Sequence, residues 1–152
     1  MSRLQPFTIP DLVDAPNAAF GHPTDIRFQD VDGAAIVFYS RFFEYFHDAY
    51  AAFLRHHGIS LAEAVRTGDW LAPLTHAEAE FVHPLRFGDS AVVEVVRARV
   101  GHSSLRVGYR IVLAGTSTVC TVGQTVHVMV SRETFRPMPV PEHVRRAFEG
   151  IP

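Results

Sequence analysis

The sequence has 152 residues, 14 Lys and Arg against 16 Asp and Glu, a net charge of −2, 47% hydrophobic residues and one cysteine. A chain of this length can bury a core without metals or cross-links, so we predict one domain over residues 1–152. The single Cys120 excludes an intramolecular disulfide, and the absence of basic runs argues against binding to nucleic acid or to a membrane surface.

The two ends of the chain are rich in proline. Residues 1–22 form an arm in which Pro6, Pro10 and Pro16 interrupt any apolar run, so we expect no secretory signal and a cytoplasmic protein. No apolar stretch approaches the ~20 residues that span a bilayer. At the other end we predict a tail over 137–152 with a short helix at 142–148.

A short strand and a long helix are predicted in the first half of the chain. The strand covers Asp25 to Phe28 and leads into a polar turn at 29–33. The helix runs from Ser40 to His57, because apolar residues recur there at helical spacing: Phe42, Tyr45, Phe46, Ala49 and Phe53. Gly58 ends this helix, and a short second helix follows at 60–65.

The aromatic residues around the long helix exceed what one buried face can hold. Aromatic residues at helical spacing are usually core, and the stripe fits that interpretation. The further rings at Phe38, Tyr39, Phe43 and Tyr50 would lie on a second face and indicate a partner subunit or an apolar ligand. We therefore expect at least a dimer.

The second half of the chain is typical of long strands. Four segments rich in Val, Thr and Ile are separated by short connections: 71–83, 91–100, 103–113 and 118–130. Such connections predict antiparallel hairpins between successive strands. We predict an α+β fold, in which one long helix packs on a single antiparallel sheet of about five strands.

Two carboxylates, Asp30 and Asp32, lie between the predicted strand and the start of the helix. One interpretation is that both are turn and capping residues, which Asp favours for local reasons. The other is catalysis, because the free amides of a helix N-terminus can stabilise an oxygen that becomes negative while a nearby Asp attacks or activates water. Spacing alone does not decide between them.

Two motifs carry a resemblance to a known family. Phe28-x-Asp-x-Asp-Gly-Ala-x-Ile-Val-Phe-Tyr39 resembles the opening motif of the 4-hydroxybenzoyl-CoA thioesterase family of hotdog-fold proteins. Phe81-x-x-Pro-Leu-Arg-Phe-Gly-Asp89 resembles the junction between the second and third strands of the same family. The resemblance covers roughly residues 24–141. One departure is Ala35, where the family commonly has Gly.

The resemblance implies a hotdog fold, dimers that join their sheets, tetramers built from two dimers, and an acyl-CoA bound at the subunit interface. It makes Asp32 the nucleophile or general base and the backbone N–H of Tyr39 the group that polarises the thioester. Asp30 would support the loop beside the substrate. The remaining substrate-binding residues implied are Ile36, Val37, Phe38, Ser103 and Ser104.

The residues that hold the CoA phosphates are less defined. Ser103 and His127 stand near the positions where the family prototype has basic residues. Charge alone makes Arg132 and Arg136 candidates instead.

A metal site is one interpretation of His76, Glu78 and Glu80, which alternate on one strand face. The alternative is a polar face that pairs with Arg97 or Arg99 of the next strand, and we prefer it. We predict neither a metal nor a cofactor, and we place Cys120 in the core.

The sequence-based hypothesis is thus a cytoplasmic acyl-CoA thioesterase that hydrolyses an aryl or medium-sized acyl-CoA to the free acid and CoA. Two alternatives stay open: a thioesterase for acyl groups on a carrier protein, and a hotdog protein that binds acyl-CoA without hydrolysing it. Substitution of Asp32 separates the enzyme from the binder.

Overall fold

The computed structural model describes residues 3–152. Its helices and strands follow one another as α1 (Ile9–Val13), β1 (Phe20–Asp25), the 3-10 helix η1 (Phe28–Asp30), α2 (Arg41–His56), α3 (Leu61–Thr67), β2 (Trp70–Leu71), β3 (Leu74–Phe81), β4 (Ser90–Val100), β5 (Ser104–Leu113), β6 (Val119–Val128), β7 (Val130–Ser131) and α4 (Glu142–Phe148).

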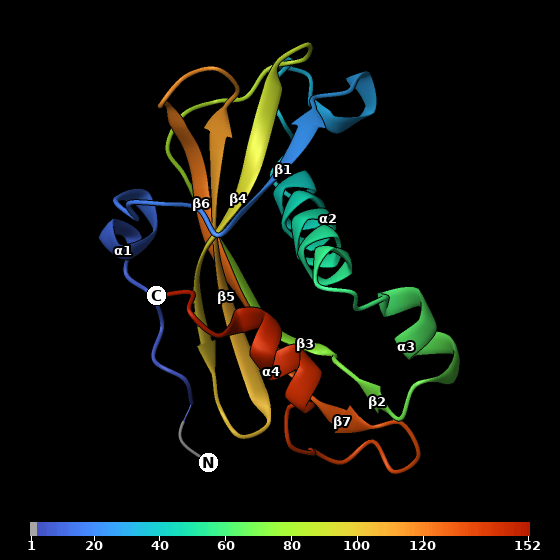
Figure 1. The fold of residues 1–152 in the computed structure, drawn as a ribbon. Coiled ribbons are helices and arrows are strands. Elements are labelled where there is room, and N and C mark those ends of the chain that lie inside the picture. Colours follow the sequence, from blue (N-terminus) through green and yellow to red (C-terminus); the bar gives the residue numbers. More distant parts are fainter. Residues whose placement is uncertain (1–2) are drawn as a thin grey trace.

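Five strands form one antiparallel sheet in the order β1-β4-β5-β6-β3, and α2 lies across one of its faces (Figure 1). The short strands β2 and β7 pair with each other in a separate two-stranded sheet. The predicted α+β arrangement, with one long helix on a five-stranded antiparallel sheet, is confirmed. Because β3 pairs with β6 on one side only, its other edge is open.

The stripe predicted for the long helix is its buried face. All five of its residues are buried, and Phe46 stacks on Tyr109 of β5 with ring centroids 4.8 Å apart. The residue paired with Tyr109 on β6 is Gly123, and a Cβ atom there would lie 2.4 Å from Phe46 Cε2. A glycine at 123 is therefore required for α2 to approach the sheet.

The opposite face of the sheet is covered by the N-terminal segment, which Figure 1 shows on the side away from α2. Phe7 and Leu12 pack against Val96 and Val122. The side-chain amide of Gln124 accepts a hydrogen bond from Phe7 N at 3.0 Å and donates one to Phe7 O at 2.9 Å. The predicted arm at 1–22 thus contains α1 and the start of β1, and its apolar residues form a second hydrophobic cluster on this face of the sheet.

The strand predicted at Asp25–Phe28 is wrong. The strand ends at Asp25, and the backbone then turns through η1, where the Asp30 carboxylate accepts a hydrogen bond from Arg27 N at 3.1 Å. The true strand escaped prediction because Gly21 and Pro23 weaken its pattern. Proline is tolerated there, since β1 is an edge strand that pairs only with β4.

Two long strand predictions are each divided in the structure. Residues 71–83 contain the end of β2 and all of β3, separated at Ala72 and Pro73, and residues 118–130 contain β6 and the start of β7. The predicted hairpin between 71–83 and 91–100 is also wrong, because β3 pairs with β6 and β4 pairs with β1 and β5. The segment 82–89 connects β3 to β4.

The predicted C-terminal tail includes α4, whose predicted bounds are correct. Val144 and Phe148 of α4 are buried, and the ring of Phe148 lies 4.7 Å from that of Phe53 on α2. This part of the tail belongs to the core. No helix within residues 3–152 is long and apolar enough to cross a membrane.

Candidate active site

Asp32 opens a tight turn that leads towards α2. The backbone N–H of Asp32 donates to Ile36 O at 2.9 Å, and that of Ala35 donates to Asp32 O at 2.9 Å. The side-chain Oδ1 of Asp32 accepts a hydrogen bond from Ala34 N at 2.8 Å. Within the described chain the second oxygen, Oδ2, has no hydrogen-bond partner. The turn thus orients the carboxylate and leaves one oxygen free.

Ala35 has a left-handed backbone with a φ of 59°. This conformation is strained for a residue with a Cβ atom and costs about 1 kcal/mol relative to glycine. It explains why glycine suits this position in the family that the sequence resembles. The alanine keeps the same turn, since both turn hydrogen bonds are present.

Asp32 lies at a cavity of about 380 Å³, the Asp32 cavity, which is mainly apolar. Its lining consists of Asp32, Ile36, Val37, Phe38, Tyr39, Phe42, Phe81, Val82, His83, Pro84 and Leu85. Five residues proposed from the sequence are therefore brought together. The sequence analysis placed Phe42 in the core and assigned no residue of 81–85 to the site, although this segment lies within the second family motif.

The N-terminal end of α2 offers a free backbone donor at this cavity. The helix begins at Arg41, and its cap residue Ser40 makes no side-chain capping bond. The N–H of Tyr39 is without a hydrogen-bond acceptor among residues 3–152. A free amide at a helix N-terminus can stabilise an oxygen that develops negative charge.

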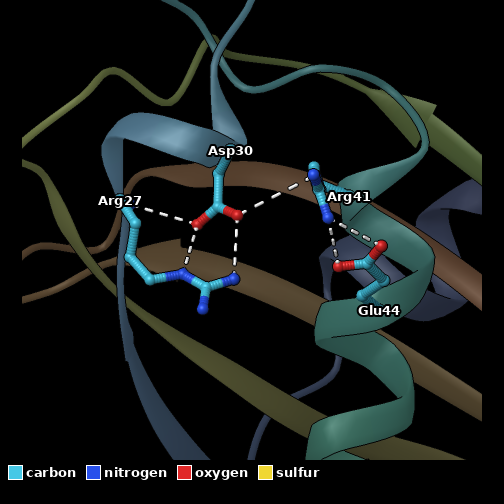
Figure 2. A network of polar contacts seen from close by, with 4 residues as sticks. All are labelled: Arg27, Asp30, Arg41 and Glu44. Atoms are coloured by element: carbon cyan, nitrogen blue, oxygen red, sulfur yellow. Dashed lines mark hydrogen bonds and ion pairs between the residues drawn. The ribbon is translucent and has the colours of Figure 1, made fainter.

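Asp30 has a different environment from Asp32. Its carboxylate is fully buried and receives Arg27 Nε at 3.0 Å, Arg27 Nη2 at 2.9 Å and Arg27 N at 3.1 Å (Figure 2). Burial alone would raise the pKa of Asp30, but the hydrogen bonds from Arg27 outweigh burial and hold this pKa below its usual range. Arg41 Nε lies 3.9 Å from Asp30 Oδ1, and Nη1 of the same guanidinium is paired with Glu44.

Tyr45 of α2 lies beside the same carboxylate. Its buried hydroxyl has no hydrogen-bond partner of standard geometry among residues 3–152. Burial first, and then the neighbouring Asp30 carboxylate, raise the pKa of this phenol. Asp30 thus joins the strand-to-helix loop to α2 and does not line the Asp32 cavity.

The two serines proposed for substrate binding lie elsewhere. Ser104 lines a separate cavity of about 510 Å³ together with Thr75, Glu78 and Arg106, and Ser103 is buried beside it in the chain. Neither lines the Asp32 cavity of the same chain.

The structure places the residues of two further sequence-based predictions in other contacts. The guanidinium of Arg132 donates to the carbonyl oxygens of Ala64, Val65 and Arg66 at the end of α3, so it is occupied in stabilising that helix terminus. The pairing of the β3 acids with Arg97 or Arg99 is wrong, because β3 does not neighbour β4.

On β3, His76 instead bonds Glu78 at 2.9 Å, and Glu78 also accepts a hydrogen bond from Gln124 of β6 at 2.5 Å. No cluster of three His, Cys, Asp or Glu side chains in residues 3–152 could hold a metal.

A larger cavity of about 630 Å³, the α3 cavity, lies between α2, α3 and β2. Its lining is mainly apolar: His47, Tyr50, Leu61, Ala62, Ala64, Val65, Arg66, Trp70, Leu71, Ala72 and His127. The rings of Tyr50 and His127 stack with centroids 4.5 Å apart. The sequence singled out Tyr50 only as an aromatic residue beyond the stripe, and the fold places it at this cavity.

His127 ends a buried chain of hydrogen bonds. A carbonyl oxygen can only accept, so Nδ1 carries a proton and donates to Ala72 O at 3.3 Å. In the neutral imidazole Nε2 then accepts from the Thr125 hydroxyl at 3.3 Å, and the Thr125 oxygen accepts from the Tyr109 hydroxyl at 3.2 Å. Burial lowers the pKa of His127 to about 4, from 6.5.

We expect protein stability to fall in acid because of His127. As the pH drops through 6.5, the unfolded chain binds a proton at this imidazole, whereas the folded chain binds it only near pH 4. Between these values the free energy of unfolding should decrease by about 3 kcal/mol. Urea unfolding at pH 7, 5.5 and 4 measures this decrease, and a His127→Gln variant should lose that part of the pH dependence. An equal decrease in wild type and variant would contradict the assignment.

Comparison with known proteins identifies the family. A family model described as the thioesterase-like superfamily matches residues 26–148. The chain belongs to this superfamily. A 1,4-dihydroxy-2-naphthoyl-CoA hydrolase of Synechococcus elongatus is 30% identical over 121 residues, which cover 79% of this chain and 88% of that protein. A protein of the same name from Synechocystis is 27% identical over 123 residues, 81% of this chain and 89% of the relative.

Solved structures of the superfamily share the fold. The crystal structure of a 1,4-dihydroxy-2-naphthoyl-CoA thioesterase from Synechocystis matches with a TM-score of 0.80 at 26% identity, over 85% of this chain and 94% of that one. A gentisyl-coenzyme A thioesterase matches with a TM-score of 0.74 at 25% identity, over 85% and 98%. The hotdog fold and the prediction of a thioester hydrolase are confirmed. These relatives are named for other aryl-CoA esters, so the 4-hydroxybenzoyl branch stays a prediction.

Proposed function

We propose that this member of the thioesterase-like superfamily hydrolyses the CoA thioester of an aromatic acid to the free acid and CoA. The observation that carries the proposal is the free oxygen of Asp32 and the free amide of Tyr39 at one apolar cavity. Aromatic rings at this cavity, including Phe42 and Phe81 with centroids 5.0 Å apart, suit a flat acyl group. The relatives named for aryl-CoA substrates support the same class.

In the proposed reaction the Asp32 carboxylate acts on the thioester carbonyl in one of two ways. As a nucleophile, Oδ2 bonds to the carbonyl carbon, the carbon–sulfur bond breaks, CoA leaves as a thiolate, and water then hydrolyses the acyl-Asp anhydride. As a general base, Oδ2 takes a proton from water while the water oxygen bonds to the carbonyl carbon; the carbon–sulfur bond then breaks, and the proton passes to the CoA thiolate. Both routes place negative charge on the carbonyl oxygen, which the Tyr39 N–H would stabilise.

We also propose a dimer in which the open edges of β3 pair antiparallel across a two-fold axis. Val82 N donates to Cys120 O of β6, so by strand alternation Ala79 and Ala77 direct their amides to the open edge. Exposed Leu74 and Phe81 stand at the two ends of β3. An open strand edge with exposed apolar side chains at both ends favours pairing with a second chain.

Such pairing would bring two cavities together. The Asp32 cavity lies at the end of β3, and the α3 cavity includes Leu71 and Ala72, just before its start. In an antiparallel pair the end of one β3 lies beside the start of the other. The α3 cavity of one protomer would then adjoin the Asp32 cavity of its partner and enlarge the apolar space for the acyl group.

We expect Ala77→Pro to convert the dimer into a monomer, because proline lacks the edge N–H and cannot pair with a second strand. Light scattering with size-exclusion chromatography measures the change in mass. Ala77→Ser, which keeps the N–H, should remain a dimer. A dimer that persists with Ala77→Pro would show that the subunits meet elsewhere.

The function is tested by thiol release from aryl, short-chain, medium-chain and long-chain acyl-CoA esters. We expect rapid hydrolysis of aryl esters. If no ester is cleaved, hydrolysis of free acyl-CoA is refuted; if only alkyl esters are cleaved, the aromatic preference is refuted while the thioesterase stands.

A further inference from the structure

Two phenylalanines form an exposed aromatic pair outside the Asp32 cavity. Phe28 of η1 is 77% exposed and Phe87 in the β3–β4 connection is 56% exposed. Their ring centroids lie 5.8 Å apart at an angle of 82°, so the edge of one ring meets the face of the other. Each ring keeps surface free towards solvent. Neither residue is needed for the core, and such a pair is a typical platform for a flat ring.

The aromatic pair is connected to the Asp32 cavity by one segment of backbone. His83, Pro84 and Leu85 line the cavity, and Phe87 follows two residues later. Leu85 O accepts a hydrogen bond from Val37 N at 2.9 Å, and Phe87 N donates to Ala35 O at 3.2 Å. The segment is therefore fixed along the Asp32 turn, and it leads from the cavity to the pair.

Two arginines flank the aromatic pair. Arg86 is exposed and has no ion-pair partner in the described part of the chain. The Arg27 side chain is 55% exposed, and its Nη1 is not used in the contacts with Asp30. Two carboxylates lie near these arginines in the chain and are held by uncharged donors: Asp89 accepts from Arg86 N at 2.8 Å, and Asp25 accepts from the Ser90 hydroxyl at 2.6 Å. The unpaired Arg86 and the one unused nitrogen of Arg27, Nη1, adjoin the two phenylalanines in the chain and can bind the phosphates of an aromatic ligand.

We propose that Phe28 and Phe87 bind the adenine ring of the CoA substrate and that Arg86 and Arg27 bind its phosphates. The pantetheine chain would follow the segment 83–87 to the Asp32 cavity. This proposal rests on the proposed function, because the same thioester must reach Asp32. It adds a recognition site for the nucleotide, which distinguishes CoA from an acyl group carried on a protein. The guanidinium of Arg86, which has no ion-pair partner among residues 3–152, favours a ligand with phosphates over an apolar contact with a second copy of the chain.

The test compares two thioesters of one aromatic acid, the CoA ester and the N-acetylcysteamine ester, which lacks the nucleotide. For Phe87→Ala we expect KM for the CoA ester to rise about tenfold with kcat unchanged, since stacking of a base on an aromatic ring is lost. The N-acetylcysteamine ester should react as with wild type. Arg86→Gln should raise KM for the CoA ester and weaken its salt dependence. Phe135→Ala, at a distant exposed ring, is the matched control.

Equal effects of Phe87→Ala on the two esters, or no effect on either, would overturn the proposal. A change in oligomeric mass of Phe87→Ala by light scattering would assign the pair to a subunit contact instead. Calorimetric titration with free CoA separates this proposal from the proposed function. If wild type cleaves no ester but binds CoA, and Phe87→Ala binds CoA about tenfold more weakly, the nucleotide site is supported although the proposed hydrolysis is refuted. If wild type does not bind CoA, the site is refuted.

Discussion

Asp32→Asn should lower kcat by about 10³-fold or more and leave the fold intact. An amide is neither a nucleophile nor a base at neutral pH, so both proposed roles of the carboxylate are lost. The side-chain oxygen of Asn can still accept the hydrogen bond from Ala34 N, which sits 2.8 Å from the present Oδ1. Asn also suits this turn position. Kinetics with an aryl-CoA ester and thermal unfolding should be measured on the same preparation.

Asp48→Asn is the matched control for Asp32→Asn. Asp48 is an exposed carboxylate on α2 outside both cavities that adjoin this helix, and its change should leave activity unaltered. If Asp32→Asn retains wild-type activity while the enzyme is active, Asp32 is only a turn residue. If Asp32→Asn unfolds, the charge of Asp32 stabilises the turn beyond the hydrogen bond from Ala34, which Asn can still accept.

Asp30→Ala, in contrast to Asp32→Asn, should lower the free energy of unfolding by about 2 kcal/mol. The buried carboxylate holds three hydrogen bonds from Arg27, and alanine removes all of them. The loss is smaller than for a fully buried pair, because the Arg27 guanidinium is largely exposed and water can hydrate it. A chain of this size should melt about 4 to 8 °C lower, by calorimetry.

The control for Asp30→Ala is Glu44→Ala, which breaks an exposed ion pair with Arg41 and should cost less than about 1 kcal/mol. The folded fraction of Asp30→Ala should keep substantial activity, since Asp30 does not line the Asp32 cavity. If instead Asp30→Ala kept full stability and lost kcat about 10³-fold, Asp30 would be the catalytic carboxylate.

The contrast between the two aspartates could not be read from their spacing. They lie two residues apart in a polar segment and both suit turns. Arg27 stands within reach of one of them only because η1 bends the backbone between the strand and the turn. The family motif pointed to Asp32, and the fold supplies the physical difference: one carboxylate is buried against a guanidinium, and the other has a free oxygen at a cavity.

The sequence predicts those helices and hairpins whose formation depends on residues close together in the chain. The α2 stripe, α4 and the two hairpins β4–β5 and β5–β6 could be predicted, because helical spacing and short turns depend on neighbouring residues. The strand at β1 could not, since its Gly and Pro are tolerated only through its place at the sheet edge.

Only the tertiary structure decided which distant segments meet. The pairing of β3 with β6 overrules the shorter connection to β4, because the order of strands depends on what α2 and the sheet bury together. That pairing brings the segment 81–85 to the Asp32 turn and leaves one edge of β3 open. The sequence by itself therefore determined the fold class and the superfamily, and its motif made Asp32 a candidate, while the cavity at Asp32 and the course of the chain to Phe87 follow from long-range packing, which no local pattern encodes.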